Sequence, residues 1–300
     1  MSDSPPLVSI LIPAHRAAAY LGETLASVGA QTWPHWEVLV FEDGIYDNTS
    51  EIVYSFAAHS GHRVELLRSQ DNLGVSRARN ALLDAARGSS IAFLDADDTW
   101  TPDHLAHSLQ LLRATRAEWV VGGANYIDQQ GRITRRDVLP PVLPPARIPT
   151  SLLEHNFVLT GAVVADAAVF ASGLRFDPSL KIGEDLDVWV RIVCAGRRTA
   201  FSKRATFNYR KHPVSTTADP VRFPEEFSVL FEKYLGQPEV DQLICRRLLR
   251  DMLLNVARMT WRRDPRRALA SLHRLFRFNR WSPQAWAYCL LAHLRAGTTS

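Results

Sequence analysis

The feature that most constrains the fold is a regular alternation of short apolar runs with segments rich in helix formers. Apolar runs at 7–12, 36–41, 64–67 and 91–94 have the length of buried strands. The expected helices between and after them cover 17–28, 51–58, 72–86 and a segment that starts at Pro102. Parallel strands joined by helices need right-handed crossovers, which put helices on both faces of the sheet. The alternation therefore predicts an α/β fold with a Rossmann-like, mostly parallel sheet.

The pattern changes in the second half of the chain. Residues 119–122 form a further expected strand, whereas 139–149 contain five prolines and are expected to be an extended connector. From residue 225 onward the chain is helical in character, with prolines at the expected boundaries between helices. We expect one α/β domain over 1–224 and a helical, arginine-rich region over 225–300.

Charge is divided unequally along the chain. From residue 241 onward there are twelve arginines and no lysine against three aspartates, about +9, whereas the preceding residues carry about −5. A basic C-terminal region indicates an anionic neighbour such as a membrane surface, a lipid-linked phosphate or nucleic acid, and the alternative is a solvated helical face. No signal peptide and no run long enough to cross a bilayer is visible. The three cysteines lack metal-ligand spacing and are expected to be reduced thiols.

Carboxylates follow two of the predicted strands. Asp43 comes after the second strand, and the fourth strand runs directly into Asp95, Asp97 and Asp98 in "IAFLDADDTW". In open sheets of this type, ligands bind beyond the carboxyl ends of the strands. Two acids in Asp-x-Asp spacing repel each other unless a cation lies between them. Mg²⁺ or Mn²⁺ prefers oxygen ligands and takes its remaining ligands from water and phosphates, so a nucleoside diphosphate is the expected partner.

Two later segments carry further candidate residues. In "KIGEDLDVWVR", Glu184 and Asp185 stand at the start of an expected helix. A carboxylate there can be a helix cap, or a general base if the helix start faces the metal site. In "NYRKHPVSTT", His212 is either a surface histidine or a contact to a metal or phosphate.

These segments together resemble glycosyltransferase family 2, whose GT-A-fold members use nucleotide-activated sugars. The matching stretches are, in family order, "VSILIPAHR", "WEVLVFEDGIYDNT", "DNLGVSRARNAL", "AFLDADDTWTPDHL", "GEDLDVWVR" and "YRKHPVS". They span residues 7 to about 217. The resemblance implies an inverting, metal-dependent transfer of one sugar from a nucleotide-sugar. Within the family, a UDP-sugar is the expected donor. The expected role is bacterial surface polysaccharide or glycoconjugate synthesis.

The resemblance also implies a role for particular residues. In the donor site, Asp43 would bind the nucleobase, and Pro13 and Ala14 would line the same pocket. Asp95 would contact the ribose or the metal shell, and Arg79 would contact the diphosphate or the donor sugar. Gly161 would line the site of the sugar. In catalysis, Asp185 would be the base and Glu184 its positioning neighbour. For Mn²⁺ or Mg²⁺, Asp97 would be the direct ligand and His212 a ligand or diphosphate contact.

Two departures from the family pattern and several alternatives stay open. His15-Arg16 replaces the usual Tyr-Asn, and "FEDGIYD" replaces the common "VDDGSTD", so the donor preference is less securely implied. The Gln-x-x-Arg-Trp motif of processive members is absent, which favours transfer of a single sugar. The alternatives are a catalytically degenerate sugar-nucleotide-binding or interaction protein and a nucleotidyltransferase. The latter is disfavoured because "PAHRAAAYLG" is not a Gly-rich loop.

The arginine-rich C-terminal region is not covered by the resemblance. "RMTWRRDPRRALASLHRLFRFNRW" mixes arginine with aromatic and aliphatic residues at helical spacing. It is expected either to dock on a membrane surface near a lipid-linked acceptor or to pack against the catalytic domain or a second subunit. Without a recognisable nucleic-acid-binding module, nucleic acid is not an expected partner. The expected location is the cytoplasm, with the inner face of the plasma membrane as the alternative.

Overall fold

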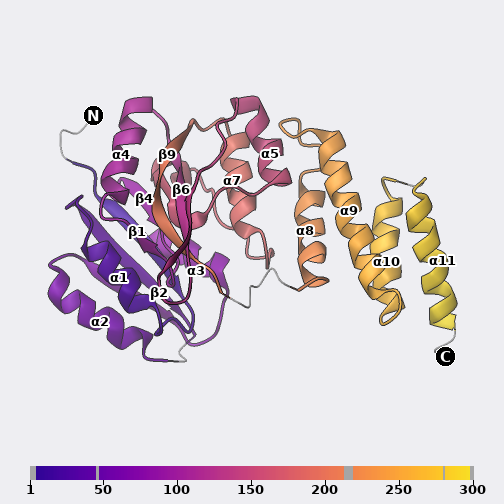
Figure 1. The fold of residues 1–300 in the computed structure, drawn as a ribbon, viewed down its shortest axis with the longest axis horizontal. Coiled ribbons are helices and arrows are strands. Elements are labelled where there is room, and N and C mark those ends of the chain that lie inside the picture. The colour runs from indigo at the N-terminus through magenta and orange to yellow at the C-terminus, as the bar shows by residue number, and fades with distance from the viewer. Residues whose placement is uncertain (1–4, 45–46, 213–218, 280, 298–300) are drawn as a thin grey trace. The chain divides into compact units, whose positions relative to one another are not determined.

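The computed structural model describes residues 5–44, 47–212, 219–279 and 281–297 (Figure 1). The chain forms two compact units. The first comprises 1–148, 156–178 and 184–212, and the second comprises 149–155, 179–183 and 213–300. The second unit thus begins before the boundary at residue 224 that the sequence suggested, and it takes in two short segments from earlier in the chain.

Nine strands of the described chain form one sheet in the first unit, in the order β3-β2-β1-β4-β8-β6-β9-β5, with β7 paired to β6. The strands are β1 (Val8–Ala14), β2 (Trp36–Asp43), β3 (Val64–Ser69), β4 (Ser90–Phe93), β5 (Thr99–Trp100), β6 (Trp119–Ile127), β7 (Ile133–Val138), β8 (Val163–Asp166) and β9 (Thr199–Arg210). Strands β3, β2, β1 and β4 are parallel, as the alternation predicted. Strand β8 is antiparallel to both β4 and β6, which makes the sheet mixed.

Helices flank this sheet. They are α1 (Leu21–Gly29), α2 (Thr49–Ser60), α3 (Val75–Ala85), α4 (His104–Thr115), α6 (Ala168–Ala171) and α7 (Glu184–Cys194), together with the 3₁₀ turns η1 (Pro145–Arg147) and η2 (Thr160–Ala162). In Figure 1, α1 and α2 lie on one side of the strands and α7 on the other. The central strands are almost entirely buried, so their continuous apolar runs form the core of the unit.

Several helix boundaries differ from the prediction for local physical reasons. Helix α1 begins at Leu21 because Ala17–Tyr20 form a turn whose first carbonyl accepts from Tyr20 and Leu21. Helix α3 begins at Val75 because the preceding Gly74 has a φ of 90°. The proline-rich connector is shorter than expected, since α5 (Ile148–Glu154) begins at Ile148 and accommodates Pro149 in its first turn.

The second unit is helical, as predicted. Besides most of α5 it contains α8 (Arg222–Lys233), α9 (Gln242–Thr260), α10 (Pro265–Phe276) and α11 (Pro283–Gly297). The side chain of Asp241 caps α9, and Asp264 with Pro265 starts α10, which is the capping chemistry expected at helix N-termini. Among the described residues, no helix has the length and apolar run needed to cross a bilayer.

Candidate active site

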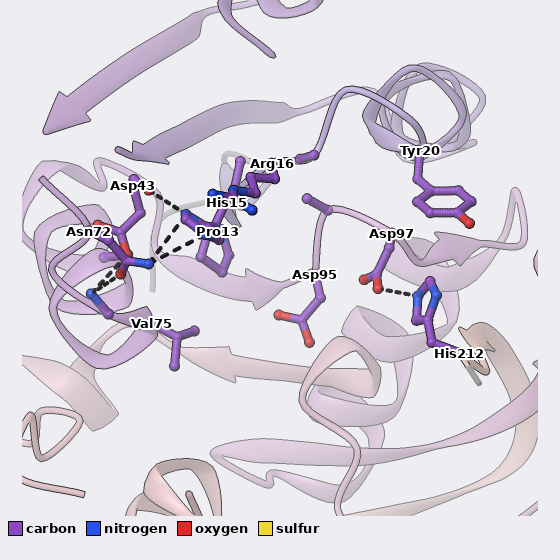
Figure 2. A pocket seen from close by; sticks show the side chains of 15 residues that line it. Pro13, His15, Arg16, Tyr20, Asp43, Asn72, Val75, Asp95, Asp97 and His212 are labelled. Carbon is purple, nitrogen blue, oxygen red and sulfur yellow. Dashed lines mark hydrogen bonds and ion pairs between the residues drawn. The ribbon is translucent and has the colours of Figure 1, made fainter. Parts of the chain in front are cut away.

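A cavity of about 440 Å³ opens at the carboxyl ends of β1, β2 and β4 (Figure 2). Figure 2 shows Asp43 and Asn72 at one end of it, Asp97 and His212 at the other, and Asp95 between them. The cavity is lined by Pro13, Ala14, His15, Arg16, Ala17, Tyr20, Asp43, Asn72, Gly74, Val75, Ala78, Asp95, Ala96, Asp97 and His212. Six of the sequence-predicted site residues therefore border one space, although they come from segments up to two hundred residues apart: Pro13, Ala14, Asp43, Asp95, Asp97 and His212.

At one end, Asp43 organises the loop that precedes α3. Its two carboxylate oxygens accept hydrogen bonds from the backbone N–H groups of Leu73 (2.6 Å) and Gly74 (2.8 Å). The ring Nδ1 of His15 lies 2.7 Å from the Asp43 carbonyl oxygen. Asp43 is almost fully buried, so its carboxylate is fixed at the cavity wall and keeps lone pairs for a further donor.

At the other end, Asp97 and His212 are in direct contact. His212 Nε2 lies 2.8 Å from Asp97 Oδ2, and the ring of Tyr20 meets that of His212 edge-on with centroids 5.5 Å apart. Burial and the charge of Asp95 raise the pKa of Asp97 above its ordinary value, while His212 opposes this shift. A carboxylate whose charged form is disfavoured in this way is stabilised by a cation that enters the cavity.

The third acid of the motif, Asp98, is not among the residues that line the cavity. It is 1% exposed and accepts a hydrogen bond of 2.7 Å from the backbone N–H of Arg210. Burial, together with the charges of Asp97 and Asp95, raises the pKa of Asp98 well above its usual range. Asp98 therefore joins the motif to strand β9 and does not contribute to the cavity wall.

Arg210 holds the same loop in place through its side chain. Its guanidinium donates to the backbone carbonyl of Asp97 (2.7 Å) and to Glu23 (2.7 Å), and it lies over the ring of Tyr20. Two more hydrogen bonds go to the carbonyls of residues 128 and 129. The position of Asp97 is thus fixed by a buried arginine that belongs to a distant strand.

Arg79 joins the acidic motif to the start of α7. One guanidinium nitrogen lies 2.9 Å from Asp95 Oδ1 and another 2.9 Å from Glu184 Oε1. Burial lowers the pKa of Arg79, but the carboxylates of Asp95, Glu184 and Asp185 raise it more, so the guanidinium stays charged. Arg79 is not among the residues that line the cavity, and its contact with a diphosphate or a donor sugar stays a prediction.

Asp185 lies in the first turn of α7, beside Glu184. It accepts from the N–H of Leu186 (2.7 Å), and the side-chain amide of Asn156 lies 3.5 Å from its other oxygen. Burial raises the pKa of Asp185, with Arg79 opposing, and burial with the charge of Asp185 raises that of Glu184. Because Glu184 and Asp95 share the guanidinium of Arg79, the start of α7 and the Asp-x-Asp motif lie within one cluster of charges.

Gly161 is enclosed by the core and does not line the cavity. Its carbonyl accepts from the indole N–H of Trp100 (2.7 Å), and a Cβ at this position would lie 2.3 Å from the ring of Phe207. The absence of a side chain is therefore explained by packing against Phe207, and a sugar contact of Gly161 stays a prediction.

The donor set at the Asp97 end suits a hard divalent cation with few protein ligands. Among the described residues, no group of three or more His, Cys, Asp or Glu side chains is arranged to hold a metal. The adjacent oxygen of Asp97 and nitrogen of His212 supply two donors, and Mg²⁺ or Mn²⁺ commonly takes the others from water and substrate phosphates. The residues present therefore fit a metal that binds together with a diphosphate.

Sequence reasoning did not identify some residues that shape this site. Tyr20 contacts both Arg210 and His212. The side chain of Asn72 lies beside that of His15 in the wall of the cavity. The position of His15 directly after Pro13-Ala14, at the end of a buried strand, could have indicated its place in the wall. Arg210 carries no local signal, because its partners are distant in sequence.

Comparisons with known proteins show which family the chain resembles. ExoO, a succinoglycan biosynthesis protein of Rhizobium meliloti, is 32% identical over 69% of this chain and 61% of its own length. WfgD of Escherichia coli, a UDP-Glc:α-D-GlcNAc-diphosphoundecaprenol β-1,3-glucosyltransferase, is 34% identical over 41% of this chain and 47% of its own length. The chain thus matches about half to three fifths of these relatives.

A solved structure and a family model extend the comparison. The structure of S. aureus TarS 1–349 in complex with UDP-GlcNAc superposes with a TM-score of 0.68 at 17% identity, covering 97% of this chain and 87% of that one, and so shows a shared fold. The GT-A fold expected from the sequence is confirmed. The model of glycosyl transferase family 2 matches residues 9–182, more than half of the chain. The chain belongs to glycosyltransferase family 2.

Proposed function

We propose that the chain transfers a single sugar from a nucleotide-sugar, with UDP as the nucleotide, to a hydroxyl group of a glycan or lipid-linked acceptor. The reaction would invert the anomeric centre and serve bacterial polysaccharide or glycoconjugate synthesis. The observation that carries the proposal is the single cavity that runs from Asp43 to the Asp97–His212 pair. Family membership, the polysaccharide role in the name of ExoO and the UDP-sugars named with WfgD and TarS support it.

The two ends of the cavity suit the two ends of a nucleoside diphosphate. At the Asp43 end, a buried carboxylate beside Pro13 and Ala14 offers an acceptor for a nucleobase N–H. At the Asp97 end, the imidazole of His212 and the carboxylate provide donors for a divalent cation, Mn²⁺ or Mg²⁺. When bound there, such a cation would neutralise charge that develops on the leaving diphosphate.

The residues at the start of α7 suit proton transfer. Asp185 would accept the proton of the acceptor hydroxyl, whose oxygen attacks the anomeric carbon while the bond from that carbon to the diphosphate breaks. Its raised pKa makes it a better proton acceptor than an ordinary aspartate once it is ionised. Glu184, held by Arg79, would keep the first turn of α7 in register with Asp95.

The proposal is tested by calorimetry and thermal shift with UDP-, GDP- and dTDP-sugars, each with Mn²⁺ and with EDTA. We expect a UDP-sugar to stabilise the chain in the presence of Mn²⁺, by about 2.7 kcal/mol when the ligand is at a hundred times its Kd. Asp97→Ala should abolish the metal-dependent part of this effect.

The matched control is Asp84→Ala, which removes an exposed carboxylate paired with Arg175. It should bind the donor as the unaltered chain does. If no nucleotide-sugar binds, or if Asp97→Ala binds with the same metal dependence, the proposed donor site is wrong.

A further inference from the structure

The last helix of the second unit presents an apolar row to solvent. Trp286, Leu290 and Leu294 recur every four residues on α11, so they lie on one face of the helix. Their exposed fractions are 57%, 64% and 63%, and Trp281, just before the helix, is 92% exposed. We call these four residues the α11 face. A contiguous exposed apolar face of this kind marks an interaction surface.

The other side of α11 already has a partner within the unit. Ala285, Cys289 and Ala292 are buried, and α11 packs against α10, its neighbour in Figure 1. The ring of Trp286 lies 4.6 Å from that of Phe276 of α10, measured between centroids. Leu290 and Leu294, together with the part of Trp286 that Phe276 does not cover, therefore form a second apolar side of α11 that is exposed in the described chain.

The charged residues of α10, α11 and the segment between them have one sign. Residues 265–297 contain six arginines and no aspartate or glutamate. Two of them, Arg267 and Arg274, form ion pairs with Glu225 and Glu232 of α8. In contrast, Arg266 and Arg277 are exposed and form no ion pair with any described residue. The region therefore carries positive charge that its own unit does not neutralise.

We propose that the α11 face docks on the surface of an anionic phospholipid membrane. Trp281 precedes the helix and Trp286 lies in its first turn. Tryptophan is favoured at the boundary between lipid headgroups and acyl chains. The leucines would enter that boundary, and the arginines would contact lipid phosphates, as in helices that lie in the plane of an interface. The helix would lie on the membrane and not cross it, consistent with its length and hydropathy.

The same charges disfavour a symmetric contact between two copies of this face. A two-fold interface brings the same patch of both subunits together, so two regions of positive charge would approach each other. A lipid surface supplies the missing negative charge. The proposal rests on the second unit alone and does not depend on the donor or acceptor proposed above.

The test is flotation of the full chain with vesicles of phosphatidylcholine containing 30% phosphatidylglycerol and with vesicles of phosphatidylcholine alone. We expect binding to the anionic vesicles at low salt, at least about tenfold weaker binding to the neutral ones, and loss of most binding in high salt. Leu290→Ser with Leu294→Ser should weaken binding to the anionic vesicles by about 100-fold, since two apolar side chains are withdrawn from the lipid phase.

The matched control is Leu243→Ser, which removes a leucine of α9 that is 82% exposed and lies outside the α11 face. It should bind vesicles as the unaltered chain does, and both variants should keep the circular dichroism of the parent. Absence of binding to anionic vesicles, or equal binding by the double variant, overturns the proposal. A dimer by light scattering that the double variant dissociates, without vesicle binding, would assign the face to a second copy instead.

Discussion

Two buried arginines lie behind the acidic motif, and they are held in different ways. Arg79 is surrounded by carboxylates: it pairs with Asp95 and Glu184, and Asp185 is close enough to raise its pKa. The side chain of Arg210 instead donates mainly to backbone carbonyls, and its one carboxylate partner among the described residues is the half-exposed Glu23. The first arrangement compensates charge, whereas the second fixes the path of the chain. The difference indicates that Arg79 supports the carboxylates of α7 and that Arg210 supports the Asp97–His212 pair.

The largest expected effect is on stability when Arg79 is removed. Arg79→Met should lower the free energy of unfolding by about 3–5 kcal/mol, because the partly buried carboxylates of Asp95 and Glu184 lose their buried counter-ion. Guanidinium denaturation measures the change. The control is Arg247→Met, which removes a half-exposed ion pair with Glu154 and should cost at most about 1 kcal/mol. Equal losses in the two variants would contradict the charge-compensating role of Arg79.

A smaller loss of stability is expected when Arg210 is removed, together with weaker binding of the nucleotide. Arg210→Met should cost about 1.5–3 kcal/mol, since most of its partners are carbonyls and Glu23 can be hydrated. It should also weaken Mn²⁺-dependent UDP binding by about tenfold, because Asp97 loses the contact that positions it. Calorimetry of the folded variant separates the two effects. If UDP binding is unchanged while stability falls, Arg210 has no role in positioning Asp97.

The pH dependence of turnover should reflect the protonation of the two carboxylates at the start of α7. Burial raises the pKa of both Glu184 and Asp185, so the protonated, inactive form of the base persists to a higher pH than for an ordinary aspartate. We expect kcat at saturating donor to fall on acidification by about tenfold per pH unit, beginning above pH 3.8. Rates measured over the range in which circular dichroism is constant test this. A flat profile down to the ordinary aspartate pKa would contradict a role for Asp185 as base.

The smallest of these effects is expected for His212. His212→Ala should weaken Mn²⁺-dependent UDP binding by about tenfold and leave binding without metal unchanged, because Asp97 still offers a carboxylate. His59→Ala, which changes an exposed histidine of α2, is the control. An equal loss of affinity with and without Mn²⁺ would assign His212 to the diphosphate and not to the metal.

Much of the fold follows from local sequence pattern. The buried strands β1, β2 and β4 are nearly continuous apolar runs, and the acids that follow them stand where an open sheet binds ligands. The antiparallel strand β8 was not predicted, because its position between β4 and β6 depends on pairing between segments distant in sequence. Strand β7 is exposed along most of its length, so it lacks the apolar signal of a buried strand.

The site was predictable where residue type and spacing are enough. Asp97 and His212 were matched by motif, and the structure brings their side chains into contact. The roles of Arg79 and Arg210 could not be read in this way. Whether an arginine faces the cavity or lies behind its wall depends on the three-dimensional positions of the carboxylates around it. Gly161 shows the same limit, since its motif does not reveal that Phe207 occupies the space beside it.

We infer that the cavity binds the nucleotide between its Asp43 and Asp97 ends and that Asp185 takes the proton of the acceptor hydroxyl. The most direct test is Asp185→Asn, with donor binding measured by calorimetry and turnover measured on the same preparation. We expect binding of the UDP-sugar with unchanged affinity and a kcat lower by a factor of about 100 or more. Near-normal turnover in this variant would contradict it.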